Sequence, residues 1–147
     1  MNSTHLFASA LAAALLLTAA PASAQLGGGG ARERNRVTVE QVGVNNGAAV
    51  AQNGQANNGL VTQQGVDNLG IVQQNGNVNS GGVRQVGAGN TATLTQNNNG
   101  NRGCIVQSGT GLTANVNQNG GQYTAFIQTD RGIRPISGAL ANRLCRR

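Results

Sequence analysis

Aromatic residues and charges are scarce in this chain of 147 residues. It contains two Phe, one Tyr and no Trp, and only 10% of its residues are charged. With so few large side chains, a close-packed globular core is not expected, because apolar burial has to offset the loss of chain entropy. The low charge argues against an ordinary disordered chain, in which charge is usually high. A Gln- and Asn-rich, nearly uncharged chain is instead typical of proteins prone to β-sheet association.

Residue types that carry catalysis are also few. The one His is His5, and the acids Glu33, Glu40, Asp67 and Asp130 are scattered along the sequence. Without an acid/base pair or a cluster of metal ligands, the sequence predicts no enzyme, no metal site and no cofactor. The net charge is +6, but the basic residues are not interleaved with stacking aromatics. No specific nucleic-acid partner is therefore expected.

An apolar run lies near the start of the chain. Residues 6–20 are rich in Ala and Leu, and Ala22, Ser23 and Ala24 follow with the small-residue pattern of a signal-peptide cleavage site. The run is shorter than the ~20 residues that span a bilayer, and no second apolar segment follows. We expect residues 1–24 to be a secretory signal peptide and the mature chain, from Gln25, to contain no transmembrane segment.

From residue 41 onward, Gln recurs at every eleventh position of the sequence. With Gln as position 1, the eight repeats begin at Gln41, Gln52, Gln63, Gln74, Gln85, Gln96, Gln107 and Gln118. Position 3 is Gly in seven repeats: Gly43, Gly54, Gly65, Gly76, Gly87, Gly109 and Gly120. Position 6 is Asn in the first six: Asn46, Asn57, Asn68, Asn79, Asn90 and Asn101. Position 8 is Ala or Gly and position 10 is aliphatic throughout, from Val50 to Ile127. A register kept this long indicates specified structure.

The spacing within each repeat predicts a β-strand. Positions 6, 8, 10 and the next position 1 lie two residues apart, so their side chains share one face of a strand of six or seven residues. The Gly-bearing positions 2–5 are the predicted turn. A helix is disfavoured, because Gly at position 3 and Gly or Ala at position 8 would weaken it and leave too thin an apolar stripe.

Stacking these strands gives the predicted fold class, an all-β solenoid. Two repeats form one flat coil of 22 residues, and about four coils stack at the ~4.8 Å spacing of paired strands. Position-1 Gln and position-6 Asn side chains then face the interior and hydrogen-bond from coil to coil as a self-assembly ladder. The predicted solenoid covers residues 41–129.

The repeat also resembles that of a known family. The unit Q-x-G-x-x-N-x-A-x-V-x-Q, nearly intact in residues 41–52 and 85–96, is similar to the repeat of the curlins, the subunits of bacterial curli amyloid fibres. The resemblance implies a subunit that leaves through an outer-membrane secretion pore and polymerises at the cell surface with itself and other curlin subunits, including a nucleator. Roles in adhesion, colonisation and biofilm matrix are implied as well. Residues 25–40 resemble the Gly-rich segment by which curlins are recognised for secretion.

Some features depart from the family pattern. Leu112 and Tyr123 replace Asn in the last two repeats, which indicates a terminal coil that stacks less well. Cys104 occupies position 9, which is predicted to face outward because it lies between the inward positions 8 and 10. Cys145 lies in the tail. In an oxidising compartment these cysteines could form a disulfide; free thiols or links between subunits are the alternatives.

The tail, residues 130–147, breaks the repeat. Pro135 has no N–H for a strand ladder, and the spacing of Ile136, Leu140 and Leu144 predicts a short amphipathic helix. Five Arg residues make the tail basic. It is predicted to be a cap or an attachment to anionic cell-surface material, or else a solvated tail.

Two functions from different classes follow. The first is a secreted structural subunit that assembles through exposed strand edges. The alternative is a monomeric secreted solenoid that binds ice or polysaccharide through a flat face. A binding face of that kind would need Thr-x-Thr in every coil, whereas Thr91, Thr93 and Thr95 occur together in one repeat only. The sequence therefore favours the structural subunit.

Overall fold

The computed structural model describes residues 34–145, so the predicted signal peptide and most of the predicted secretion segment lie outside the described residues. The elements are β1 (Arg36–Val44), β2 (Gly47–Asn53), β3 (Asn58–Val66), β4 (Leu69–Asn75), β5 (Ser80–Ala88), β6 (Thr91–Asn97), β7 (Arg102–Thr110), β8 (Thr113–Asn119), β9 (Tyr123–Thr129), β10 (Gly132–Pro135) and α1 (Gly138–Cys145).

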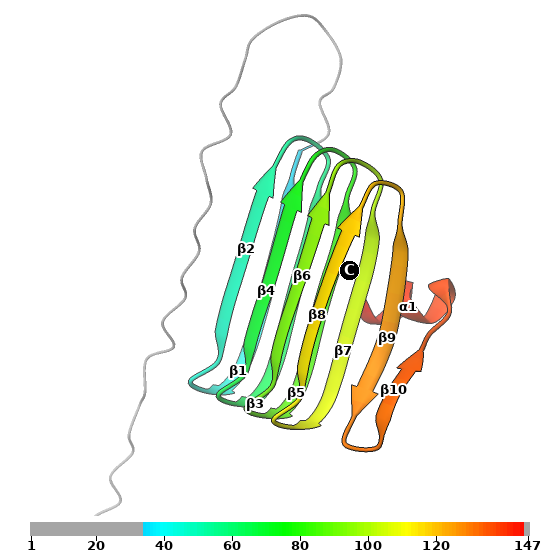
Figure 1. The fold of residues 1–147 in the computed structure, drawn as a ribbon. Coiled ribbons are helices and arrows are strands. Elements are labelled where there is room, and N and C mark those ends of the chain that lie inside the picture. The colour runs from blue at the N-terminus through cyan, green and yellow to red at the C-terminus, as the bar shows by residue number, and fades with distance from the viewer. Residues whose placement is uncertain (1–33, 146–147) are drawn as a thin grey trace, which may run out of the picture.

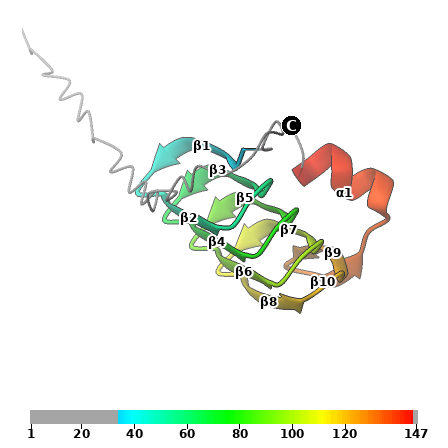
Figure 2. The ribbon, with the colours of Figure 1, turned by 90° about the horizontal axis from the view of Figure 1, so that it is seen from above.

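The strands form two sheets that face each other. One sheet has the order β1-β3-β5-β7-β9-β10 and the other β2-β4-β6-β8; we call them the odd and the even sheet. Strands pair in parallel with the strand one coil later, and only β10 runs antiparallel to its neighbour β9. Figure 1 shows the two layers, and Figure 2 shows the coils stacked side by side. The predicted β-solenoid of about four 22-residue coils is confirmed.

A narrow apolar column fills the space between the sheets. It contains the aliphatic residues of position 10 and the Ala residues of position 8: Val50, Val61, Val72, Val83, Leu94, Ile105 and Val116, with Ala48, Ala92 and Ala114. Position 8 must stay small, because a Cβ at Gly59 would lie 2.7 Å from Cγ1 of Val50, and one at Gly103 would lie 2.7 Å from Cδ1 of Leu94. Burying each aliphatic side chain contributes about 1.5–3 kcal/mol.

The two kinds of strand differ in length, which the repeat did not predict. The odd strands from β1 to β7 have nine residues and the even strands have seven. As a result, Gly43, Gly65, Gly87 and Gly109 lie one residue before a strand end and only Gly54, Gly76 and Gly120 lie in turns. Position 5, which the sequence analysis did not single out, also has positive φ, even at Val78 (φ 60°).

The register changes by one residue before β9. The turn between β8 and β9 has three residues, whereas the other turns from an even to an odd strand have four. Gln107 therefore pairs with Gln128 at a sequence separation of 21, in place of the 22 that separates Gln85 from Gln107. In the same way, Ile105 pairs with Phe126. The prediction that Ile127 and Tyr123 occupy the inward positions 10 and 6 was wrong, because the shortened turn moves both side chains to the outer face.

The tail folds back onto the outer face of the odd sheet. β10 pairs with β9, and α1 then crosses the sheet on the side away from the even sheet (Figure 2). Cys104 in β7 and Cys145 in α1 form a disulfide with a sequence separation of 41 residues. In the chain-entropy account, a loop of this length stabilises the fold by about 4 kcal/mol.

The Gly residues of position 3 offer a test of the coil stacking. Gly65 has a φ of +128°, and a Cβ there would overlap the carbonyl oxygen of Gly87 in the next coil. We expect Gly65→Ala to lower the free energy of unfolding by about 3 kcal/mol. Gly111→Ala, at φ +67° with nothing within 4 Å of the new Cβ, should lower it by only about 1 kcal/mol.

The measurement is denaturant unfolding of freshly refolded soluble protein, followed by far-UV circular dichroism. Equal losses for the two variants would mean that the backbone conformation alone, and not the close approach of successive coils, makes Gly necessary at position 3.

Candidate functional site

Two ladders of Gln side chains run along the solenoid axis, one on each sheet. In the odd sheet, Nε2 of each Gln donates to Oε1 of the Gln one coil later, at 2.6, 2.8, 2.9 and 3.0 Å, through Gln41, Gln63, Gln85, Gln107 and Gln128. In the even sheet, the same bonds of 2.8, 2.8 and 2.7 Å join Gln52, Gln74, Gln96 and Gln118. The ladders therefore place all eight predicted Gln residues in two columns.

From Gln52 onward, the side-chain amide of each ladder Gln also donates across the core, whereas that of Gln41 donates to the carbonyl oxygen of Asn46. Gln63 Nε2 donates to the carbonyl oxygen of Gly47 at 2.8 Å, and Gln74 Nε2 donates to that of Asn58 at 3.0 Å. The pattern repeats up to Gln118, whose Nε2 donates to the carbonyl of Arg102 at 2.9 Å. These bonds tie the two sheets together in addition to the apolar column.

The Asn residues of position 6 form ladders at the turns. Nδ2 of Asn68 donates to the carbonyl oxygen of Gly87 in the next coil at 2.9 Å, and its Oδ1 accepts from the backbone N–H of Asn90 at 3.2 Å. Asn46, Asn57, Asn79 and Asn90 make the corresponding contacts. Oδ1 of Asn101 accepts from the N–H of Gln122, but its Nδ2 donates to Oδ1 of Asn79 and to the carbonyl oxygen of Asn97. Each Asn thereby fixes the turn of one coil above the turn of the previous coil.

This interior is polar but fully paired. Gln63, Gln85, Gln96, Gln107 and Gln118 are all 0% exposed. Within residues 34–145, every buried side-chain nitrogen or oxygen has a hydrogen-bond partner. Since an unpaired buried amide costs about 1–3 kcal/mol, the coils have to stay in register for the interior to be stable.

Two ladder residues were missed by the sequence analysis. Asn35 lies one repeat unit before Asn46, and its Oδ1 accepts from the N–H of Asn57 at 2.9 Å. Gln128 completes the odd ladder, although it comes one position too early after Gln118 for the fixed repeat. Extending the repeat backward by one unit would have found Asn35, but the assumption of a constant spacing concealed Gln128.

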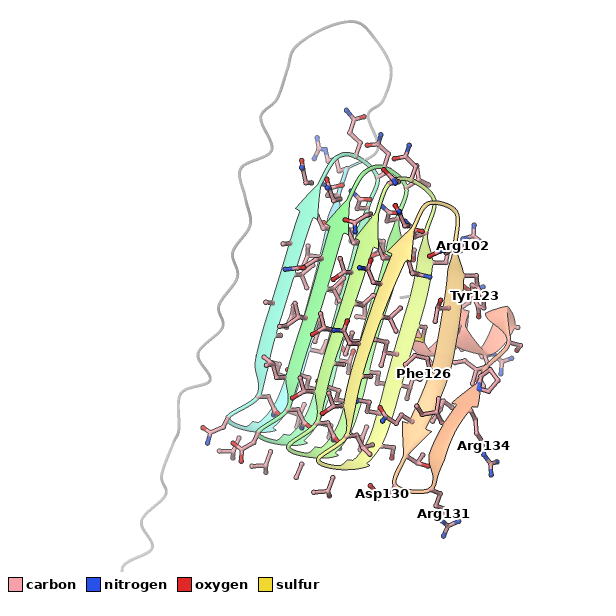
Figure 3. All side chains as sticks on the ribbon, viewed as in Figure 1. Arg102, Tyr123, Phe126, Asp130, Arg131 and Arg134 are labelled. Carbon is pink, nitrogen blue, oxygen red and sulfur yellow. A yellow bond between two sulfur atoms is a disulfide. The ribbon has the colours of Figure 1, made fainter. Side chains whose placement is uncertain are left out.

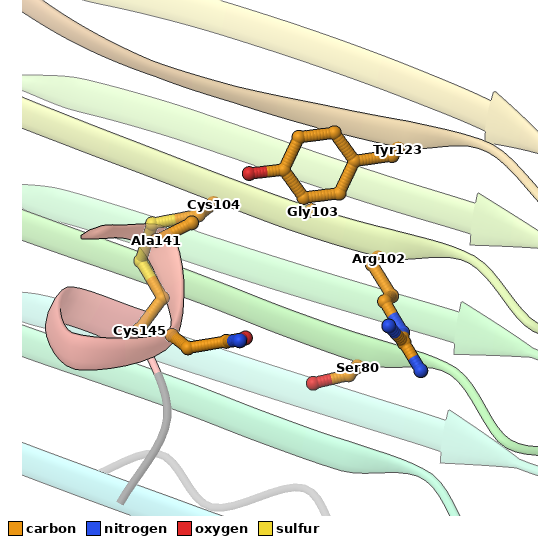
Figure 4. Close-up of a pocket in the computed structure, with 8 residues that line it drawn as sticks. Ser80, Arg102, Gly103, Cys104, Tyr123, Ala141 and Cys145 are labelled. Carbon is orange, nitrogen blue, oxygen red and sulfur yellow. A yellow bond between two sulfur atoms is a disulfide. The ribbon is translucent and has the colours of Figure 1, made fainter. Parts of the chain in front are cut away.

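The predicted disulfide cysteines lie away from the ladders. Cys104 and Cys145 are on the outer face of the odd sheet, in a small cluster with Val106, Ala125 and Ala141. Beside the disulfide is a pocket of about 20 Å³ bordered by Ser80, Arg102 and Tyr123, among others (Figure 4). This outer cluster holds the helix, and the residues that line the pocket do not include any ladder amide.

The remaining surface offers little for ligand chemistry. Among the described residues, no group of three or more His, Cys, Asp or Glu side chains could hold a metal ion. The only helix of residues 34–145 has eight residues, and no helix there is long and apolar enough to cross a membrane. The four strands of the even sheet contain no charged residue, whereas Arg102, Arg131 and Arg134 belong to the odd sheet and its tail (Figure 3).

The two ends of the solenoid expose strand edges. Within the described residues, β1 and β2 pair on one side only. β8, the last strand of the even sheet, pairs with β6 and has a free edge on its other side. Each ladder Gln donates to the Gln of the next coil toward the C-terminus, so the side-chain donor from a preceding coil is missing at Oε1 of Gln41 and Gln52 in the described part of the chain. The first coil thus offers acceptors, and the last coil carries the donors of Gln118 and Gln128.

These features define a class of protein: a parallel β-solenoid whose interior consists of in-register amide ladders and whose ends expose unpaired strand edges. Residues 65–97 match the family model of the curlin associated repeat. This match confirms the resemblance to the curlin family, and the chain carries the curlin repeat. The comparisons with curated proteins and with solved structures gave no match.

The ladder can be tested with two neighbouring Gln residues of β4. Gln74 is 2% exposed, accepts from Gln52 and donates to Gln96, whereas Gln73 is exposed on the outer face. Gln74→Ala leaves the ladder groups of both neighbours unpaired, so we expect the free energy of unfolding to fall by about 3 kcal/mol. Gln73→Ala should change it by less than about 0.5 kcal/mol.

Both values follow from denaturant midpoints of the soluble protein at equal concentration. If Gln73→Ala were as costly as Gln74→Ala, the interior ladder would not be the source of the stability.

Proposed function

We propose that this protein is an exported structural subunit that polymerises end to end into cross-β fibres. The observation that carries the proposal is the pair of Gln ladders, which run in register along the solenoid and reach the unpaired edges of β1, β2 and β8 in the described residues. An unpaired edge is a template for another chain, and identical side chains in register make the added chain fit.

The polarity of the ladders favours head-to-tail docking. The odd sheet has one more solenoid strand than the even sheet, so the next place in the coil lies beside β8. If β1 of a second copy, turned by half a turn about the axis, pairs in parallel with β8, Nε2 of Gln118 meets Oε1 of Gln41, as Nε2 of Gln96 meets Oε1 of Gln118 within the chain. Docking of two first coils would bring acceptor against acceptor. The charge-free strand β8 adds no like-charge repulsion to such stacking.

The family supplies the cellular setting of the proposal. By resemblance to curlins, the subunit is secreted through an outer-membrane pore, assembles at the cell surface with a nucleator and other curlin subunits, and contributes to adhesion and biofilm matrix. The apolar run of residues 6–20 and its cleavage pattern support export. We assign no catalytic role, in keeping with the scattered acids.

The alternative, a monomeric binding module for ice or polysaccharide, is not supported by the outer face of the even sheet. Thr91 stands beside Thr113, but Thr93 stands beside Asn115 and Ile71. No two-column array of Thr runs along the sheet, so we retain the fibre subunit alone.

Assembly itself is the first expected outcome. Residues 25–147, diluted from denaturant at micromolar concentration, should form fibres that bind amyloid dyes and diffract at ~4.7–4.8 Å along the fibre axis. A chain that remained a soluble monomer for days under these conditions, with or without seeds, would contradict the proposal.

A charge placed in the ladder at the open edge should stop docking. Gln41→Lys replaces an acceptor with an ammonium group that would face the donor of Gln118 in a second copy. We expect fibre elongation to slow by roughly tenfold or more. Val42→Lys, on the exposed outer face of the same strand, is the matched control and should elongate at close to the unchanged rate.

Seeded elongation rates from dye fluorescence, at equal protein and seed concentrations, give the comparison. An equal effect of the two lysines would attribute the slowing to net charge and would exclude the proposed contact between Gln41 and Gln118.

A further inference from the structure

The last coil of the solenoid is open on one sheet and covered on the other. β10 pairs with β9 from Thr129 to Phe126, and the N–H of Ile136 donates to the carbonyl oxygen of Ala125 at 3.0 Å. β8 has no partner beyond β6 within the described residues. A second copy that continues the coil here, turned by half a turn about the axis, would find a place for its β1, on β8, but no place for its β2, on β9.

β10 is itself a poor template for a further strand. It has four residues, whereas β2 has seven, and it ends at Pro135, which has no N–H to donate. Arg134 lies within it and Arg131 immediately precedes it, and both are exposed at this edge (Figure 3). Shortness, proline and charge are the features by which natural sheet edges resist pairing with another chain.

α1 keeps this strand in place from the outer face. Ala141 and Cys145 are buried against Cys104 and Val106 of β7, and Ile136 and Leu144 pack against the same cluster. An eight-residue helix is marginal by itself, so its position depends on this small cluster and on the covalent link between Cys104 and Cys145.

Gly82 gives independent evidence that the sheet is shaped for the helix. This residue lies beside Cys104 in the odd sheet, and a Cβ there would lie 2.5 Å from Cβ of Cys145. At the same position of the preceding odd strands the residues are Thr38 and Leu60. The side chain is absent at the place where the end of α1 rests.

We propose that β10 and α1 form a disulfide-locked cap that closes the β9 edge against β2 of a second copy, and that reduction of the Cys104–Cys145 disulfide opens it. The inference rests on the proposed self-assembly and adds its regulation. With the disulfide intact, the last coil docks a second copy through β8 only. With the disulfide reduced, the tail detaches and both β8 and β9 accept the incoming coil.

The opening step requires a dithiol reductant. One thiolate of the reductant attacks a cystine sulfur, the S–S bond breaks, and a mixed disulfide forms; the second thiolate then releases it. Two electrons and two protons pass from the dithiol to the protein, which gains two thiols, while the reductant becomes a disulfide. Since Cys104 and Cys145 are only 2% and 3% exposed, the attack follows a local opening of α1.

The experiment measures seeded elongation of residues 25–147 in the oxidised form, in the form reduced by dithiothreitol, and as C104S/C145S, each with seeds of its own kind. The double variant supplies the open state without depending on access of the reductant. We expect the reduced protein and the double variant to elongate roughly tenfold faster than the oxidised protein, because docking gains the backbone hydrogen bonds of the β9 edge. Dithiothreitol should not change the rate of C104S/C145S.

A second variant separates the cap from the cysteines themselves. The C104S chain that ends at Asp130 lacks β10 and α1 and should elongate as fast as C104S/C145S. Equal rates for oxidised, reduced and truncated protein would overturn the cap and leave the proposed assembly intact. Failure of every form to produce fibres would overturn the proposed assembly and the cap with it.

Discussion

The hydrogen bond between identical Gln side chains in successive coils is the constraint on which the rest of this structure depends. A buried amide that loses its partner costs more than the bond itself contributes, so the ladder is stable only when complete. Gln96 shows the requirement: it accepts from Gln74, donates to Gln118 and donates to the carbonyl of Ser80. A shift by one residue would turn every such amide to the outer face and expose the aliphatic column.

The other sequence preferences follow from this requirement. The coils must lie one strand spacing apart along their whole length, including the turns, so the backbone at position 3 has no room for a Cβ. The interior must also stay narrow enough for an amide on one sheet to reach a carbonyl on the other, which excludes large residues at position 8. The narrow interior thus explains why aromatic residues are scarce. The one Phe of the described solenoid, Phe126, lies in the last coil, where no further coil follows.

Sequence periodicity was sufficient to predict the solenoid, its coil length and the inward columns of Gln, Asn and aliphatic residues, because each depends on spacing alone. It did not reveal the unequal strand lengths, because position 3, which is Gly in seven repeats, was assigned to a turn in every repeat. The two kinds of repeat do differ around it: position 2 is Asn in every even strand, and position 4 is Val, Ala or Thr in the odd strands. It also misplaced Ile127 and Tyr123, because a turn shortened by one residue is invisible when the sequence is counted at a fixed interval. β10 was missed for a different reason: its pairing with β9 depends on the geometry of one short hairpin and on no repeat.

The shortened turn before β9 also separates the regular coils from the segment that ends the solenoid. Up to β8, the inner face of each strand carries apolar and amide side chains. In the even sheet, the outer face packs against no other described element. After the shortened turn, the outer face of β9 carries Ala125 and Ile127, which pack against the tail, while Gln128 still completes the inner ladder. β9 therefore belongs to both systems: its inner face continues the solenoid, and its outer face and edge hold the segment that ends it. A solenoid of parallel coils has two unlike ends by construction, and within residues 34–145 the segment that covers a strand edge lies at the β9 end of the odd sheet.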